Sequence, residues 1–356
     1  MVVGLSGGVD SAVAALLLRE QGHEVQALFM KNWEEDDREG HCAAAEDLAS
    51  ARAVADHLGI ALGTVNFASE YWDRVFARFL SEYRVGRTPN PDILCNSEIK
   101  FRAFLDFALA RGADYIATGH YAARGERDGR PCLERACDEV KDQTYFLHRL
   151  NGGQLRRALF PLAGLSKREV RERARKAGLP NFARKDSTGI CFIGERRFRE
   201  FLTHYLPARR GPMETPDGEF LGYHQGLMYY TIGQRRGLGV GGRAGASEAP
   251  WFVAAKDLER NALILAQGHD HPLLLHPRLE AAQVHWIRTA ARPGEPLSAR
   301  IRHRQPLQAC RILGFEGDRC RVEFGAPQWA IAPGQAVVFY RGRECLGGAV
   351  IERALP

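Results

Sequence analysis

The first 120 residues alternate between short apolar runs and longer segments in which apolar residues recur at helical spacing. The apolar runs occupy residues 2–5, 24–30, 61–66 and 114–118. The helical segments occupy residues 11–21, 43–58, 71–83 and 101–111, and a Gly directly follows three of them. Because parallel strands need long crossover connections, usually helices, this alternation predicts an α/β fold with a doubly wound parallel sheet.

The rest of the chain changes character twice. Residues 145–206 are predicted to be mostly helical, most clearly in SKREVRERARKAGLP, where Ser166 begins a capping box and Gly178 is a stop signal. Gly and Pro then become frequent, and short β-type runs broken by turns follow, which is typical of a small β-barrel. The expected domains are a catalytic domain with a helical extension at 1–206, a small mainly β central domain at 207–274 and a C-terminal β-barrel at 275–356.

Positive charge is concentrated near the C-terminus. The chain carries a net charge of +6, and residues 272–356 hold 12 Arg and no Lys against 7 acidic residues, a surplus of five. A localised basic surface suggests a polyanionic partner, although a small, well-solvated basic domain is the alternative interpretation. No apolar run is long enough to cross a bilayer, and the N-terminus lacks a signal-peptide pattern. We therefore expect a cytoplasmic protein with no membrane partner.

Residues 4–11, GLSGGVDS, lie between the first predicted strand and the first predicted helix. Two Gly residues let the backbone approach a ligand closely, and the helix N-terminus offers N–H groups to a phosphate. Met30 and the Gly119–His120 pair follow other strands, and ligands of open α/β sheets bind beyond such strand ends. A core position for Met30 and a buried neutral His120 remain open as alternatives. The candidate nucleotide-binding residues are Gly4, Leu5, Ser6, Gly7, Gly8, Val9, Asp10, Ser11, Met30 and Gly119.

Eight Cys are spread along the chain without a CxxC spacing, which favours neither a disulfide scaffold nor a zinc site. Cys95 and Cys191 lie in stretches that we interpret as polar loops. Lys185 and Arg196 flank Cys191, and cationic neighbours lower the pKa of a thiol and so favour the nucleophilic thiolate. Asp92 is placed to move a proton within the loop of Cys95. An inert, buried thiol is the better interpretation at positions 132, 137, 310, 320 and 345.

Two resemblances refine this picture. The S-G-G-x-D-S loop resembles the pyrophosphate loop of ATP pyrophosphatases, which split ATP between the α and β phosphates and place AMP on a substrate oxygen. Over essentially the whole chain, further motifs are similar to those of the tRNA-specific 2-thiouridylase family. They include FMKNWEEDD, GRTPNPDILCN, ATGHYA, KDQTYFL, KDSTGICFIGERRFREFL, HQGLMYYTIGQRRGLGVGG and PGQAVVFYRGRECLGGAVIE.

The family resemblance implies an enzyme that uses ATP, with Mg²⁺, to adenylate the C2 oxygen of the wobble uridine in tRNAs for Lys, Glu and Gln. Sulfur would arrive as a persulfide from a relay protein. Cys191 would carry the persulfide, Cys95 would attack it and leave a Cys95–Cys191 disulfide, and Asp92 would act as acid and base. Asn90, Pro91 and Asp92 would meet the flipped target base, since flipping a base out of a single-stranded loop costs little free energy. Other tRNA contacts would be His120, Lys141, Asp142, Gln143, Arg302, His303 and Gln335.

Three alternatives stay open at this point. A different adenylating enzyme on the same loop, such as an amide ligase, would not need the two Cys residues. A non-catalytic RNA-binding protein would bind tRNA without releasing pyrophosphate. Within the thiouridylase interpretation, Asp92, Cys95 and Cys191 could instead hold an iron–sulfur cluster, which we do not favour.

Overall fold

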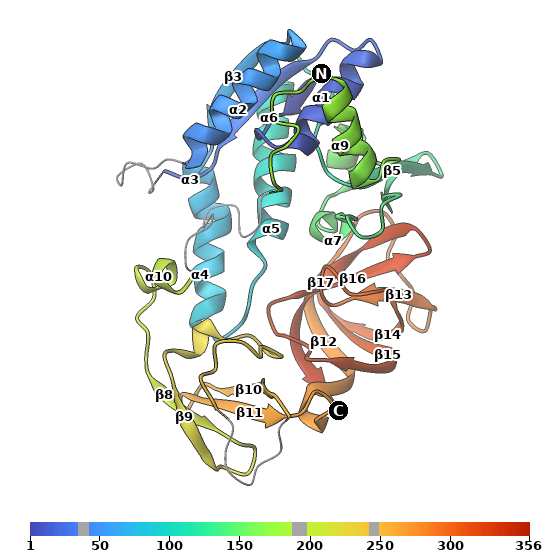
Figure 1. The fold of residues 1–356 in the computed structure, drawn as a ribbon. Coiled ribbons are helices and arrows are strands. Elements are labelled where there is room, and N and C mark those ends of the chain that lie inside the picture. The colour runs from blue at the N-terminus through green and yellow to red at the C-terminus, as the bar shows by residue number, and fades with distance from the viewer. Residues whose placement is uncertain (35–42, 187–197, 242–248) are drawn as a thin grey trace.

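The computed structural model describes residues 1–34, 43–186, 198–241 and 249–356. Figure 1 shows an α/β unit at the N-terminal end, a small β-sheet unit, and a barrel that ends the chain. Among the helices formed by the described residues, none combines the length and apolarity needed to span a bilayer.

The N-terminal unit contains a five-stranded parallel sheet in the order β3-β2-β1-β4-β7. Its strands are β1 (Val2–Gly4), β2 (Gln26–Lys31), β3 (Leu62–Asn66), β4 (Ile116–Ala117) and β7 (Ala158–Leu159). The helices between them include α1 (Val9–Glu20), α2 (Ala43–Leu58) and α6 (Phe104–Leu109), and α9 (Lys167–Lys176) follows β7. The predicted doubly wound sheet is confirmed, and the strand order reverses at β1, where β2 lies on one side and β4 on the other.

Residues 145–206 are less uniformly helical than predicted, because β7 adds a fifth strand beside β4. The expected capping box at α9 is confirmed: Ser166 accepts from the backbone N–H of Glu169, and the Glu169 side chain accepts from that of Ser166. The short helices of this region are α7 (Thr144–Leu147), α8 (Gly152–Arg156) and α10 (Phe198–Thr203).

The predicted helix at residues 71–83 is confirmed as one continuous helical segment that starts at residue 68. It forms α3 (Ala68–Tyr71), a π-helical stretch η2 (Trp72–Phe76) and α4 (Ala77–Arg84). After a loop, α5 (Pro91–Leu94) and a second π-helical stretch η3 (Cys95–Ala103) lead directly into α6. Asn90 caps this run by accepting a hydrogen bond from the N–H of Asp92 at 3.2 Å. The prediction that Cys95 lies in a polar loop is therefore wrong, since Asn90 and Pro91 supply helix-start signals within the Pro-rich stretch.

The C-terminal unit is a closed barrel. Strands β12 (Leu275–Trp286), β13 (Leu297–Arg300), β14 (Gln308–Glu316), β15 (Arg319–Trp329), β16 (Ala336–Arg341) and β17 (Glu344–Leu355) form it, and β12 pairs with both β15 and β17. Between α10 and the barrel in sequence, the chain forms the central sheet. Its strands are β8 (Gly211–Glu214), β9 (Phe220–His224), β10 (Trp251–Asp257) and β11 (Ala262–Gln267). The 3₁₀ turn η4 (Leu227–Tyr229) lies between β9 and β10 in sequence, and η5 (Pro272–Leu274) follows β11.

A hairpin from the N-terminal unit extends the barrel sheet. Its strands, β5 (Ala122–Arg127) and β6 (Arg130–Arg135), pair with each other, and β6 pairs with β17. Asp128 and Gly129 at its tip both have positive φ, as a two-residue type I′ turn requires. The Asp-Gly dipeptide was the sequence signal for this hairpin, and our sequence analysis missed it.

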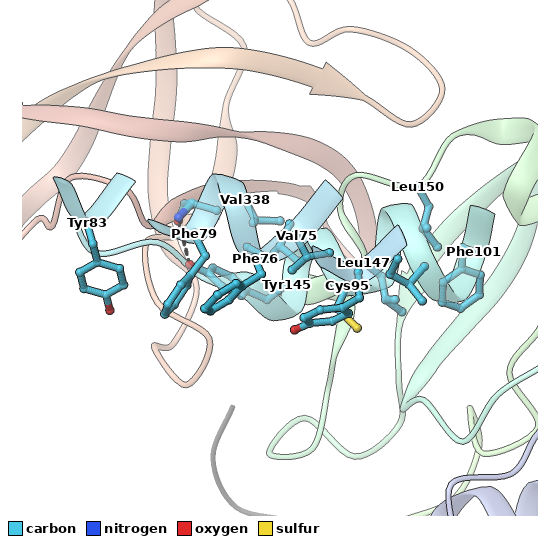
Figure 2. Close-up of a cluster of buried hydrophobic side chains, with 14 of the residues drawn as sticks. Val75, Phe76, Phe79, Tyr83, Cys95, Phe101, Tyr145, Leu147, Leu150 and Val338 are labelled. Atoms are coloured by element: carbon cyan, nitrogen blue, oxygen red, sulfur yellow. Dashed lines mark hydrogen bonds between the residues drawn. The ribbon is translucent and has the colours of Figure 1, made fainter. Parts of the chain in front are cut away.

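One buried cluster joins the helices of the N-terminal unit to the barrel. Figure 2 shows Cys95 among these side chains, together with Phe79 of α4, Tyr145 of α7 and Val338 of β16. The Tyr145 hydroxyl also donates a 3.0 Å hydrogen bond to the carbonyl of Ala336. Because the cluster crosses the two units, it fixes the barrel against the helix that carries Cys95.

Candidate active site

The nucleotide loop is closed by its own Ser side chains. The Ser6 N–H donates to Ser11 Oγ at 3.2 Å, and Ser11 Oγ donates to the carbonyl of Gly8 at 3.0 Å. Within the described residues, no side chain caps the N-terminus of α1 at Gly8. The N–H groups at this terminus can therefore serve an anionic ligand, as the sequence predicts for a phosphate cradle.

Two Gly residues are needed here for different reasons. Gly7 has a φ of +79°, and a Cβ on it would lie 2.4 Å from the carbonyl oxygen of Asp47. Gly119 follows β4, and a Cβ on it would lie 2.6 Å from the backbone nitrogen of Ser11. The chain after β4 thus packs directly on the first turn of α1, at the point where the strand order reverses.

We expect Gly119→Ala to reduce ATP affinity by about tenfold or more, because overpacking typically costs about 1–3 kcal/mol and would displace the loop that is to bind the phosphates. The added methyl would meet backbone atoms of Asp10 and Ser11, which cannot move aside as a side-chain end would. Isothermal titration with ATP measures the change. Gly164→Ala is the matched control, since a Cβ there meets nothing within 4 Å. Wild-type ATP affinity in Gly119→Ala would contradict this account of the loop.

Met30 and His120 occupy the positions that the sequence places beside the loop. A Cβ on Gly4 would lie 3.2 Å from Met30 Cε, so this side chain reaches the start of the loop. His120 is buried, its Nδ1 is 2.8 Å from Thr118 Oγ1, and burial lowers its pKa far enough to keep it neutral. Its ring also contacts Phe101, as the interpretation of a buried neutral His expects, and its contact with tRNA stays a prediction.

A charged network that the sequence did not predict surrounds Asp10. Lys167 Nζ lies 2.7 and 2.9 Å from the two Asp10 oxygens and 2.7 Å from Asp186 Oδ1. Lys141 donates to Asp186 at 2.8 Å and Arg171 does so at 2.7 Å. Although burial raises the pKa of Asp186, the hydrogen bonds from Lys141 and Lys167 hold it at about 2. Lys141 takes part in this network, and its predicted contact with tRNA stays a prediction.

Asp92 and Cys95 lie three residues apart on the α5–η3 run, so they share one face of the helix. The Asp92 side chain is half-buried, whereas Cys95 is 1% exposed. Burial raises the pKa of Asp92, and nearby Lys100 partly opposes that effect. Such a carboxyl holds its proton at higher pH than a solvated one, as a general acid requires. Cys191, its predicted partner, lies outside the described residues.

Two of the predicted tRNA contacts, Asp142 and His303, lie where the α7 region meets the barrel. The Asp142 carboxylate is buried and accepts from Arg300 at 2.9 Å, so the structure gives it no surface that could meet tRNA. His303 Nε2 is 3.0 Å from the carbonyl of Asp142, and its ring packs on Phe146. Buried Asp142 and half-buried His303 thus join the α7 region to the barrel, and a contact of His303 with tRNA stays a prediction.

Arg302 and Gln335 also make contacts between units. The Arg302 guanidinium donates to the carbonyls of Ile232 and Ala330 at 3.0 and 2.8 Å. Gln335 donates to the carbonyl of Thr88 at 2.7 Å, next to the half-exposed Asn90 and the buried Pro91. Gln143 accepts from the N–H of Tyr121 at 2.9 Å. Contacts of these residues with tRNA stay a prediction.

The other described thiols are mostly buried, as expected. Burial raises the pKa of Cys310 and Cys320 to about 12, which keeps both protonated near neutral pH. Cys137 is exposed, so the expectation of a buried thiol is wrong there. The described residues contain no cluster of His, Cys, Asp or Glu suited to a metal ion.

Three family models match consecutive parts of this chain. They are a tRNA methyl transferase HUP domain over residues 1–195, a tRNA methyl transferase PRC-barrel domain over residues 199–267 and an aminomethyltransferase β-barrel domain over residues 277–351. The domain boundaries expected at residues 206 and 274 stay a prediction.

Curated relatives match at full length. A tRNA-specific 2-thiouridylase from Thiobacillus denitrificans is 61% identical over 353 residues, which cover 99% of each chain. Another from Methylococcus capsulatus is 59% identical over 99% of this chain and 96% of that protein. A third, from Stutzerimonas stutzeri, is 58% identical over 100% of this chain and 95% of that protein. Identity at this level extends through all three units.

Proposed function

This chain belongs to the tRNA-specific 2-thiouridylase family of tRNA sulfurtransferases, and we propose that it converts the wobble uridine of tRNAs for Lys, Glu and Gln to 2-thiouridine. In the proposed reaction ATP activates the base and a Cys persulfide supplies the sulfur. The supporting observation is that one helical run carries Asp92 and Cys95 and also packs against the start of the nucleotide loop.

Asp92 and Cys95 lie near the start of that run, and Phe104 lies further along it. A Cβ on Gly4 would lie 3.4 Å from the ring of Phe104, so the helix packs against the start of the nucleotide loop. Cys95 and Phe104 are nine positions apart on one continuous helical segment, which supports a nucleotide at the loop and the Cys95 thiol acting on the same base.

In the first step the uridine C2 oxygen attacks the α-phosphorus of ATP. The bond between that phosphorus and its bridging oxygen breaks, and pyrophosphate leaves with the electron pair. The N-terminus of α1 would hold the phosphates through backbone N–H groups. This activation is needed because oxide is a very poor leaving group, whereas AMP is a good one.

In the second step the Cys95 thiolate attacks the inner sulfur of a persulfide on Cys191. The S–S bond of the persulfide breaks, a Cys95–Cys191 disulfide forms, and hydrosulfide is released. Hydrosulfide adds to C2 of the adenylated base, AMP leaves with the oxygen, and 2-thiouridine results. The two Cys residues are oxidised while the transferred sulfur is reduced, so an external thiol must restore the enzyme. Asp92 would take up and return the proton in these transfers.

Mg²⁺ would accompany ATP at the charged network. Magnesium usually binds through one or two carboxylates together with substrate phosphates. The carboxylates of Asp10 and Asp186 fit this requirement because both are about one-third exposed, at 33% and 32% of the side chain. The ion would neutralise phosphate charge beside the α1 terminus.

The tRNA and a persulfide-donating protein are the proposed partners. Exposed Arg235 and Arg236 of the central unit and Arg304 of the barrel present cations that can meet phosphates. Binding through such contacts should weaken with rising salt concentration.

The test is mass spectrometry of nucleosides from tRNA incubated with the protein, ATP and a persulfide donor. We expect 2-thiouridine at the wobble position and one pyrophosphate released for each nucleoside modified. Pyrophosphate release without thiolation would favour another adenylating enzyme, and tRNA binding without release would favour a non-catalytic binder. An iron assay and an anaerobic absorption spectrum of the active protein distinguish a persulfide route from an iron–sulfur cluster.

A further inference from the structure

We propose that Lys167 is a phosphate-binding residue of the adenylation site, where its ammonium contacts the pyrophosphate part of ATP. This inference rests on the proposed use of ATP. It adds a residue from α9 to a site that the sequence motif confines to the loop before α1.

The first argument is position. Asp10 is the second residue of α1, and Lys167 Nζ lies within 2.9 Å of both of its carboxylate oxygens. The ammonium is therefore beside the helix N-terminus at which the loop Gly residues allow close approach of a ligand. The two helices also pack against each other, which fixes the origin of the Lys side chain.

The second argument is electrostatic. The partial positive charge of a helix N-terminus repels a cation, and Lys167 stands at two such termini, because it is also the first residue of α9. Asp10 and Asp186 compensate this repulsion through their ion pairs with Lys167. Because negative charge is required to hold the ammonium at this point, the phosphates of ATP can supply that charge in place of a carboxylate.

The third argument is access. The Lys167 side chain is only 13% exposed, but the two carboxylates that hold it are one-third exposed and open the network to solvent. Lys141 and Arg171 also bind Asp186, so this carboxylate keeps cationic partners if Lys167 turns away. The long flexible side chain of Lys can thus exchange a carboxylate for a phosphate without leaving Asp186 uncompensated.

Isothermal titration of the full chain with inorganic pyrophosphate, in buffer containing EDTA, tests the proposal without metal, tRNA or sulfur donor. We expect Lys167→Met to weaken pyrophosphate binding at least tenfold. Lys176→Met is the matched control, because Lys176 lies on the same helix but is 67% exposed and pairs only locally with Glu172. Its pyrophosphate affinity should equal that of the wild type.

Asp186→Asn separates phosphate binding from a structural role. In this metal-free buffer, releasing Lys167 from one competing carboxylate should tighten pyrophosphate binding, whereas a merely structural network would lose affinity in both variants. Asp186→Asn therefore tests the proposal even if Lys167→Met fails to fold. Wild-type affinity in a folded Lys167→Met, or binding by Asp186→Asn that is no tighter than that of the wild type, would overturn the proposal. Absence of 2-thiouridine with the wild-type protein would instead refute the proposed function and leave the pyrophosphate result standing.

Discussion

Replacing Cys95 with Ala should reduce tRNA thiolation by at least about 10⁴-fold, the range seen when a nucleophile is removed. Without this thiol nothing in the proposed scheme releases sulfur from the persulfide. Pyrophosphate release dependent on tRNA should persist, because adenylation precedes the sulfur step. Thiolation is measured by nucleoside mass spectrometry and pyrophosphate by a coupled assay on the same sample.

The control for this variant is Cys345→Ala. Cys345 is also 1% exposed, in the barrel, so both variants lose a buried sulfur and should lose similar stability. We expect Cys345→Ala to keep thiolation within about twofold of the wild type, since burial raises the pKa of this thiol well above neutral pH. Repeated turnover by Cys95→Ala would contradict the role assigned to Cys95.

Replacing Arg300 with Leu should lower the free energy of unfolding by about 3 to 5 kcal/mol, the usual result of breaking a buried ion pair from one side. The Asp142 carboxylate has no exposed surface, and Arg300 donates to it at 2.9 Å. Arg135 is the other cation near it, at 3.8 Å. Urea denaturation followed by fluorescence measures the change.

An exposed pair of the same chemistry is the control. Arg311 donates to Glu323 at 2.8 Å, but its side chain is 59% exposed. Because solvent screens such pairs, Arg311→Leu should change stability by less than about 1 kcal/mol. Equal losses in the two variants would show that the Asp142–Arg300 pair does not hold the α7 region to the barrel.

The local signals in the sequence were reliable where the chemistry of a few neighbouring residues decides the outcome. Ser166 and Glu169 form the expected capping box, and helix α2 has the predicted bounds. The predictions that were wrong or missed also depend on a few neighbouring residues. Asn90 and Pro91 begin a helix that we interpreted as a loop, and the Asp128-Gly129 turn went unrecognised.

The candidate site divides in the same way. The loop from Gly4 to Ser11 could be located from its residue order, because a Gly-rich turn between a strand and a helix makes its own cradle. The position of the Lys167 ammonium could not be located from the sequence. It lies 157 positions from Asp10, and only the packing of α9 on α1 brings the two together.

The sequence by itself determined the doubly wound sheet, the barrel and the loop at the first strand end, since periodicity and turn chemistry act over a few residues. Only the tertiary structure decided which polar residues lie beside the loop and which are interior. Asp142 and His120 carry groups typical of surface contacts, yet both are buried against partners far away or desolvated by the core. Burial is a property of the assembled chain, because it depends on segments that residue order alone does not bring together.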